Sequence, residues 1–372
     1  MVKIHNTKSL VLFAAHPYDL VFYLRLVRES KIKKEYSLRV VLQEHAYFLN
    51  KSQVIEKILD EISSDVIRIK KSEIPEYGLN IIKNLIRAAR FKRNISEAVK
   101  EESVAMVLDK STYKSNIILS IFQKAILIQF PNKAKFGDIY VPSLKKNLLI
   151  KLYNMALGLH SVKVWRLKGA EKLTEEYLIN SPTTKKVYIS HGNNLDSMNF
   201  SSSAIDRPAK KILIFGSRYL GWNLEKEAVR KIYILYRNIY SEFKDHFKFI
   251  YIPHPLERGL EFNQLNKIFE SNIKLETSYL NSEHFLLENP DIAHCFSIGS
   301  TSSKSAYQMG FNSKVAYKSI LAGTKIINAF DRVFEDVPDC IHINYDSFEG
   351  VRKKIELLST EAEFDKLYEV LQ

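Results

Sequence analysis

Short apolar segments alternate with amphipathic segments along the chain. In its first half, apolar runs of strand length occur at residues 9–15, 37–42, 66–69, 104–108, 125–129, 162–165 and 187–190. Between them, apolar residues recur every three or four positions and predict helices at residues 20–28, 53–62, 79–99 and 148–157. This alternation is typical of an α/β protein with buried parallel strands.

A second series of the same kind begins near residue 212. It contains predicted strands at residues 212–215, 247–252, 292–297, 314–317 and 341–343, and a long regular helix at residues 225–243. Residues 182–211, between the two series, are poor in apolar side chains, so we interpret them as a linker. We predict an amino-terminal domain over residues 1–200 and a carboxy-terminal domain over residues 201–372, whose last helix can pack back on the first. Parallel sheets bind ligands at their carboxyl ends, so we expect both sheets to face a central cleft.

Composition and charge narrow the classes of partner. The 372 residues are 46% hydrophobic and 26% charged, as in an ordinary globular protein. The net charge of +13 favours anionic partners such as nucleotides, acidic glycans, nucleic acid or anionic lipid. No zinc-finger spacing, RNP-like run or helix-turn-helix pattern accompanies the basic segments, so we expect no nucleic-acid partner.

Cysteine usage and the lack of long apolar runs predict a cytoplasmic protein. Cys295 and Cys340 are too few for a disulfide framework, and we find no export signal. No apolar run approaches the roughly 20 residues needed to span a bilayer. Basic segments at residues 87–93 and 145–146 adjoin amphipathic runs and suggest peripheral contact with an anionic membrane, although a solvated helix face is the commoner meaning of such charges.

The most informative segment carries a histidine between two prolines. The apolar run at residues 247–252 leads into Pro253, His254 and Pro255, followed by Glu257. Pro255 favours extended backbone at His254 and ends the strand, so the imidazole should project from the strand tip. A histidine there can hydrogen-bond a phosphate oxygen, or it can simply pack in a turn.

A hydroxyl-rich segment follows a later strand. Residues 292–297 lead into a glycine and four hydroxyl residues before a predicted helix: Gly299, Ser300, Thr301, Ser302 and Ser303. The free N–H groups of a helix start, the hydroxyls and the helix dipole all favour a bound phosphate or carboxylate. Helix capping explains one of these hydroxyls but not four. The spacing is not that of a P-loop.

A third loop comes after the predicted strand at residues 212–215. It begins with Gly216, Ser217 and Arg218. Gly216 permits close approach of a ligand, and Ser217 or Arg218 can contact it, although the same residues can form a plain turn. Three such loops at the strand ends of one domain can converge on one site.

In this order, the motifs resemble bacterial sialyltransferases of the GT-B fold, namely the lipooligosaccharide sialyltransferases and the capsule polysialyltransferases. The resemblance covers residues 210–320 by motif and the first half only by architecture. It implies an α/β GT-B fold of two Rossmann-like domains and a CMP-sugar donor. It also implies that His254 binds and protonates the donor phosphate, and that the hydroxyl residues, above all Ser302 and Ser303, bind that phosphate. The predicted donor site comprises His254, Gly216, Ser217, Arg218, Pro255, Glu257, Gly299, Ser300, Thr301, Ser302 and Ser303.

The same family carries an acidic general base for the acceptor hydroxyl in its first domain. The nearest match here is Asp138, although Ile139 replaces the glycine expected after the acid. Asp138 would deprotonate the acceptor for a direct displacement that inverts the anomeric centre; the alternative is an ordinary surface aspartate. This scheme needs no metal, and the sequence has no D-x-D at a strand end, so we predict neither a metal nor a cofactor.

Four further residues are candidates for the acceptor side. His16 and Asp19 come after the first predicted strand, where His16 can also merely end that strand. His191 and Asn193 come after the run at residues 187–190. The His191 segment is similar to the Trp-His-Gly segment of teichoic-acid polyol-phosphate polymerases, which use a CDP-activated donor, but here no Trp precedes the histidine.

The resemblance predicts an inverting, metal-independent glycosyltransferase. The enzyme would move sialic acid, or a related 2-keto sugar acid, from a CMP-sugar co-substrate to a glycan or glycolipid acceptor such as lipooligosaccharide or capsule. Two alternatives remain. One is a CDP-polyol phosphotransferase of the teichoic-acid type, and the other is a non-catalytic carbohydrate- or nucleotide-binding module.

Overall fold

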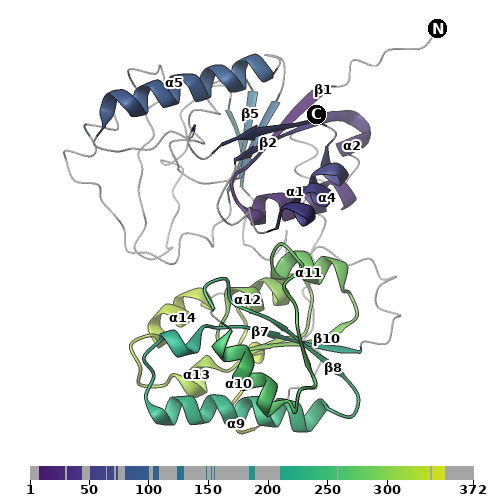
Figure 1. The fold of residues 1–372 in the computed structure, drawn as a ribbon, viewed down its shortest axis with the longest axis vertical. Helices are drawn as coiled ribbons and strands as arrows, with labels where there is room; N and C mark the ends of the chain where they lie inside the picture. The colour runs from purple at the N-terminus through teal and green to yellow at the C-terminus, as the bar shows by residue number, and fades with distance from the viewer. Residues whose placement is uncertain are drawn as a thin grey trace. The chain divides into compact units, whose positions relative to one another are not determined.

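The structure is a computed structural model. It describes residues 8–29, 32–43, 51–63, 65–70, 73, 80–99, 104–108, 124–129, 148, 152, 155, 184–188, 210–257, 259–335 and 337–347. The chain divides into two units: unit 1 is Met1–His191 with Ala362–Gln372, and unit 2 is Gly192–Glu361. Figure 1 shows their helices and strands.

Unit 1 contains a parallel sheet with helices between its strands. Its described elements are β1 (Lys8–Ala14), α1 (Pro17–Glu29), α2 (Ile32–Glu35), β2 (Tyr36–Gln43), α4 (Ser52–Ile62), β3 (Asp65–Ile69), α5 (Ile81–Ala98), β4 (Val104–Leu108), β5 (Lys124–Gln129) and β6 (Thr184–Tyr188). The six strands are parallel neighbours in the order β3-β2-β1-β4-β5-β6. Strand order therefore reverses direction between β1 and β4, the switch point where such sheets commonly bind ligands.

The core of unit 1 is built from fully buried aliphatic side chains. Leu10 and Leu12 of β1 and Leu20 and Leu24 of α1 are wholly buried. Removing each such side chain from water contributes about 1.5–3 kcal/mol. Helix α4 buries the face that carries Ile55, Ile58, Leu59 and Ile62. The apolar residues that recur every three or four positions in the sequence thus form the buried face of the helix.

Unit 2 is a second parallel sheet of the same type. Its elements are β7 (Lys211–Phe215), a 3-10 turn η5 (Tyr219–Gly221), α9 (Lys226–Phe243), β8 (Lys248–Ile252), α10 (Leu260–Ile268), β9 (Ile273–Leu275), α11 (Ser282–Glu288), β10 (Ile292–Ser297), α12 (Thr301–Gln308), β11 (Ser313–Val315), α13 (Tyr317–Ile320), α14 (Ile327–Val333) and a 3-10 turn η6 (Asp339–Ile341). The strand order is β11-β10-β7-β8-β9. The switch point lies between β7 and β10.

Both faces of the unit 2 sheet are covered, as a buried parallel sheet requires. Side chains alternate along β7: Ile212 and Ile214 join one core cluster, and Leu213 and Phe215 join another. The first cluster includes the buried face of α9, and the second includes α11, so these helices cover opposite faces of the sheet (Figure 1).

Most predicted strands and helices that fall on described residues are present, with bounds shifted by one or a few positions. The predicted strand at 341–343 is wrong: this segment overlaps the turn η6 and retains only an isolated bridge from His342 to Val315. The strand predicted at 314–317 stops at Val315, because helix α13 starts at Tyr317. Strand β6 occupies part of the predicted linker, and β9 was missed because it is only three residues long. The predicted strand at 162–165 lies outside the described residues.

Candidate functional site

Three loops lie at the ends of neighbouring strands of unit 2. They are the segments that start at Gly216, at Pro253 and at Ile298, after β7, β8 and β10. These strands are parallel and adjacent in the order β10-β7-β8, so their carboxyl ends lie at the same edge of the sheet. This edge is the switch point, where ligands of such sheets bind.

Gly216 joins the β7 loop to the histidine loop. Its N–H donates to the carbonyl of Ile252 at 2.8 Å. A Cβ atom at this position would lie 2.5 Å from the backbone nitrogen of His254, 2.6 Å from Glu257 Oε2 and 2.7 Å from the Tyr251 hydroxyl. Because no side chain fits there, the glycine allows the two loops to touch.

Ser217 joins the β7 loop to the hydroxyl-rich loop. Its buried hydroxyl accepts a long hydrogen bond, 3.5 Å, from the N–H of Gly299. A Cβ atom on Gly299 would lie 2.8 Å from Cε1 of Phe330, so this glycine also serves a close approach. The three loops are therefore in contact with one another through the buried Gly216 and Ser217.

The imidazole of His254 is held in one neutral tautomer. Its Nδ1 accepts the N–H of Leu256 at 3.1 Å, so the proton of the neutral ring is on Nε2. The half-buried position of the ring lowers its pKa from 6.5, and the positive charge of Arg218 lowers the pKa further, against a smaller opposite effect of Glu261. At neutral pH, His254 is therefore a neutral group whose Nε2–H is a hydrogen-bond donor.

Glu257 stabilises the histidine loop through hydrogen bonds. Its Oε2 accepts the hydroxyl of Tyr251 at 2.6 Å and the N–H of His254 at 3.1 Å, and its own N–H donates to the His254 carbonyl at 2.8 Å. Burial raises the pKa of Glu257 from 4.5, although these hydrogen bonds lower it in part. Its Oε1 is buried and has no hydrogen-bond partner among the described residues. Glu257 therefore holds the histidine loop in place. Pro255, in the same loop, is exposed.

Arg218 has an unusual backbone. Its φ is 54°, in the left-handed region that disfavours side chains other than Gly by roughly 1–2 kcal/mol. Its side chain is exposed and lies close enough to His254 to affect the pKa of that residue. Such strain at a strand end is often retained for a functional reason.

The start of α12 offers unpaired backbone donors. The Ser300 hydroxyl caps the helix by accepting the N–H of Ser302 at 3.3 Å, and the Ser300 carbonyl accepts the N–H of Ser303 at 3.0 Å. Among the described residues, no acceptor is found for the backbone N–H groups of Ser300 and Thr301. Thr301 is exposed, so its hydroxyl and these two N–H groups suit an oxyanion.

Ser302 and Ser303 have different surroundings. The Ser303 hydroxyl is fully buried and lies 2.7 Å from that of Ser297, so it ties α12 to β10 rather than facing the loop surface. The Ser302 hydroxyl is only partly buried and accepts a hydrogen bond from Ser282 of α11 at 2.7 Å. The Ser282 hydroxyl also lies 3.0 Å from Glu283 Oε2, and its one proton is shared between these two acceptors. Of the predicted serine pair, the geometry therefore favours Ser302 as the phosphate ligand.

Two of the acceptor-side candidates, His16 and Asp19, lie among the described residues of unit 1. The carboxylate of Asp19 is 3% exposed, and its Oδ2 accepts the N–H groups of Ala15 and His16 at 2.9 and 2.8 Å. Asp19 therefore caps the start of α1, while its Oδ1 is buried without a hydrogen-bond partner among the described residues, and its acceptor-side role stays a prediction. His16 is half-buried beside it. Asp138, His191 and Asn193 lie outside the described residues, so their roles stay predictions.

Sequence reasoning missed four supporting side chains: Tyr251, Glu261, Ser282 and Ser297. Tyr251 points inward from β8, which strand alternation could have indicated. Glu261 is buried at the start of α10 and accepts the N–H of Leu220 at 3.3 Å, linking α10 to the β7 loop. Ser282 and Ser297 pair with serines about twenty and six positions away, and no local pattern signals such partners.

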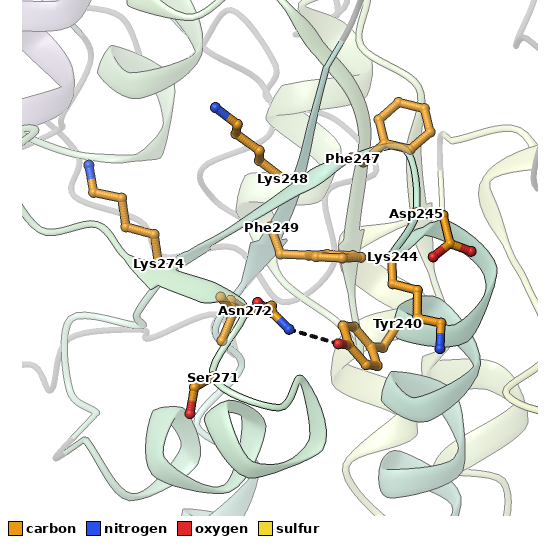
Figure 2. A pocket seen from close by; sticks show the side chains of 10 residues that line it. Tyr240, Lys244, Asp245, Phe247, Lys248, Phe249, Ser271, Asn272 and Lys274 are labelled. Carbon is orange, nitrogen blue, oxygen red and sulfur yellow. Dashed lines mark hydrogen bonds between the residues drawn. The ribbon is translucent and has the colours of Figure 1, made fainter.

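A separate hollow of about 590 Å³ lies at the opposite edge of the unit 2 sheet, where β8 and β9 begin. Figure 2 shows the Asn272 amide directed at the Tyr240 hydroxyl, a hydrogen bond of 2.9 Å. In the same view, the amino groups of Lys248 and Lys274 point away from that of Lys244, so the three cations do not converge. The hollow is therefore a poor candidate for binding a compact anion.

Within the described ranges, no cluster of three or more His, Cys, Asp or Glu side chains is arranged to hold a metal ion. None of the helices in that part of the chain combines the length and apolar character that a bilayer crossing requires.

No model of a protein family matches the chain, and no curated protein matches it either. Solved structures do. The UDP-GlcNAc 2-epimerase from Neisseria meningitidis bound to UDP-GlcNAc is 12% identical, with 98% of this chain and 99% of that chain covered and a TM-score of 0.51. The epimerase from Methanocaldococcus jannaschii is 10% identical, with the same coverage and a TM-score of 0.49. A family 9 glycosyl transferase from Veillonella parvula is 13% identical over 82% of this chain and 79% of its own, with a TM-score of 0.38.

At such low identity, the similarity concerns the fold alone. We base the fold comparison on the Neisseria structure, whose TM-score is 0.51. The chain has the GT-B-type α/β fold, which confirms the predicted fold class. None of the three structures is a sialyltransferase, so the narrower resemblance to that family stays a prediction.

Proposed function

We propose that this chain is a glycosyltransferase that binds a nucleotide sugar at the switch point of unit 2. The observation that carries the proposal is the contact of three loops at one sheet edge. Gly216 touches the His254 loop, and Ser217 accepts the N–H of Gly299 beside the start of α12. These loops carry the neutral imidazole of His254, the exposed guanidinium of Arg218 and the N–H groups at the start of α12. Together, such hydrogen-bond donors suit the phosphate of a nucleotide.

The leaving group of the reaction would be stabilised by these donors. When the bond between the anomeric carbon and the phosphate oxygen breaks, the electron pair stays on the nucleotide phosphate. The His254 Nε2–H, the N–H groups of Ser300 and Thr301 and the positive end of the α12 dipole would stabilise this charge. The Ser302 hydroxyl, which is only partly buried, would contact the same phosphate.

The narrower proposal concerns donor and outcome. The motif resemblance supports a CMP-linked sialic acid or related 2-keto sugar acid, moved without a metal or cofactor to a glycan or glycolipid. In an inverting displacement, the acceptor oxygen attacks the anomeric carbon as the CMP oxygen leaves, and a base takes the acceptor proton. Asp138 is our candidate for that base on sequence grounds alone.

The fold likeness supports nucleotide-sugar binding in a broader form. The Neisseria epimerase was solved bound to UDP-GlcNAc. A uridine nucleotide sugar therefore belongs beside the CMP-sugars in any donor test of this chain.

A donor assay tests the proposal. The protein would be incubated with CMP-sialic acid, CMP-Kdo, UDP-GlcNAc or CDP-glycerol, mixed glycan acceptors and EDTA, and nucleotide release would be measured. We expect acceptor-dependent release of CMP, unaffected by the chelator. Consumption of CDP-glycerol would instead support the polyol phosphotransferase, and acceptor-independent conversion of UDP-GlcNAc would support an epimerase. A lack of turnover with every donor would contradict the transferase and leave the non-catalytic carbohydrate- or nucleotide-binding module.

A further inference from the structure

Helix α5 of unit 1 has two faces of different chemistry. Its inward face is a regular stripe of buried side chains: Asn84, Ala88, Phe91, Ile95 and, at the carboxyl cap, Val99. These residues recur every three or four positions, so they account for the packing of α5 against the rest of the unit. The residues between them face outward.

The outward face combines exposed isoleucines with cations. Ile82 is 73% exposed and Ile86 is 48% exposed, one helical turn apart. Beside them lie four basic side chains, Lys83, Arg87, Arg90 and Arg93. The acidic residue on this helix is Glu97, which pairs with Arg93 at 3.6 Å. Large aliphatic side chains so exposed among cations call for a partner that accepts both.

The same face borders a groove of about 940 Å³. The groove is lined by Ile82, Ile86, Asn80, Asn94, Glu73 and the four basic side chains of the outward face. Four cations against one carboxylate give this lining a strongly positive balance. Apolar and cationic groups thus lie on one continuous surface.

Helix α9 of unit 2 shows that this combination is not a general property of the chain. Like α5 it has 18 residues, and it exposes Lys226, Arg230 and Arg237. None of its large apolar side chains is exposed among the described residues. A basic helix surface alone is therefore ordinary here, and α5 differs from α9 in its two exposed isoleucines.

A second exposed apolar stripe occurs in unit 1. Leu148, Leu152 and Met155 are helical, and their spacing of four and three residues puts them on one face. They are 60%, 47% and 75% exposed. The adjacent sequence carries Lys145, Lys146 and Lys151. Exposed aliphatic residues with cations nearby in the sequence therefore occur twice in this unit.

We propose that the outward face of α5 docks on an anionic lipid bilayer. Ile82 and Ile86 would enter the boundary between headgroups and acyl chains, where their surface leaves water, and the basic side chains would meet lipid phosphates. An acidic glycan matches the charge but not the isoleucines, because its surface is rich in hydroxyl groups. The surface belongs to unit 1 and is independent of the nucleotide site in unit 2 and of the reaction proposed there.

Vesicle co-sedimentation of the full chain tests this surface. We expect binding to phosphatidylcholine vesicles that contain phosphatidylglycerol, little binding to phosphatidylcholine alone, and weaker binding as salt rises above about 0.1 M. The pair Ile82→Ser and Ile86→Ser should reduce the partition coefficient about tenfold, with thermal stability unchanged. The triple variant Lys83→Gln, Arg87→Gln and Arg90→Gln should reduce it at least as much.

The matched control removes the same charge from α9. Lys226→Gln, Arg230→Gln and Arg237→Gln also replace one lysine and two arginines, and this variant should bind vesicles like the wild type. Equal losses from the α5 and α9 variants would overturn the proposal, because binding would then depend on net charge alone. A marked loss of stability in the isoleucine variant would also overturn it, since the face would then be covered within the protein. Binding to dextran sulfate but not to vesicles would assign the face to a polyanionic glycan.

Discussion

The two sheets have the same strand order around their switch points but differ in the segment that joins the first strand to its helix. In unit 1, α1 starts at Pro17, directly after β1, and the Asp19 carboxylate binds the N–H groups of Ala15 and His16. In unit 2, ten residues, 216–225, separate β7 from α9, and two of them, Arg218 and Asn223, have positive φ.

The difference concerns the backbone donors that the proposed nucleotide site of unit 2 would use. Topology brings the strand ends together in both units. In unit 1, an internal carboxylate satisfies the backbone donors at the start of α1. In unit 2, the N–H groups of Ser300 and Thr301 at the start of α12 are left without an acceptor among the described residues. The described residues of the two edges therefore differ in local chemistry although the strand order is the same.

The largest expected effect concerns Gly216. A Cβ at this position meets backbone and two polar side chains within 2.7 Å, whereas the equivalent position after β1 is already Ala15. We expect Gly216→Ala to lower the free energy of unfolding by about 1–3 kcal/mol and to abolish nucleotide binding. Urea unfolding and calorimetric titration with CMP would measure both.

The matched control for that variant is Gly221→Ala. At Gly221 the nearest atom to a new Cβ is Nε of the flexible Arg218 side chain, at 3.2 Å. This variant should keep both stability and binding. Equal behaviour of the two variants would mean that close contact of the loops is unnecessary.

The next largest effect concerns the two strand-end histidines. We expect His254→Ala to lower kcat about 10²–10⁴-fold with an unchanged circular dichroism spectrum, because a donor to the leaving group is lost. His16→Ala changes a strand-end histidine of unit 1 outside the proposed nucleotide site, so it should leave nucleotide binding unchanged. Wild-type turnover in the His254 variant would remove that imidazole from the mechanism.

A smaller effect is expected for Glu257→Gln. The amide oxygen can still accept from Tyr251 and His254, but the charge is lost and the loop shifts, so we expect a reduction of about tenfold in kcat. The raised pKa of Glu257 means that its stabilising contribution is present below pH 4.5 and is lost as the pH rises through the raised value. The variant should lose that part of the pH dependence of unfolding, and identical pH profiles would contradict the assigned burial.

The smallest effect concerns Arg218. Its charge is the second cause, after burial, of the lowered pKa of His254, so Arg218→Gln should raise this pKa toward 6.5. Because the His254 pKa is lowered, its stabilising contribution is present above pH 6.5 and declines as pH falls toward the folded pKa, and the variant should narrow that window. Nuclear magnetic resonance titration of the His254 ring measures the shift, and a lower pKa in the variant would contradict the proximity of the two residues.

Sequence patterns predicted the motifs that follow the strands of unit 2. The Pro-bounded His254, Gly216 and the hydroxyl run were each visible as strand-end motifs, because strands and helix starts have short-range signals. The capping of α1 by Asp19 was not predicted, and its predicted acceptor-side role stays a prediction. The burial of Ser303 against Ser297 was not predictable, because it depends on which side of α12 faces β10.

Hydrogen–deuterium exchange of the wild-type chain, with and without saturating CMP or UDP, measures the protection of backbone amides at both switch points in one experiment. Peptides that cover residues 298–303 and 216–221 should gain protection, since a bound phosphate would occupy the N–H groups of Ser300 and Thr301, while the peptide at residues 14–20 should not change. Protection at residues 14–20 without any change at residues 298–303 would contradict the assignment of the nucleotide to unit 2.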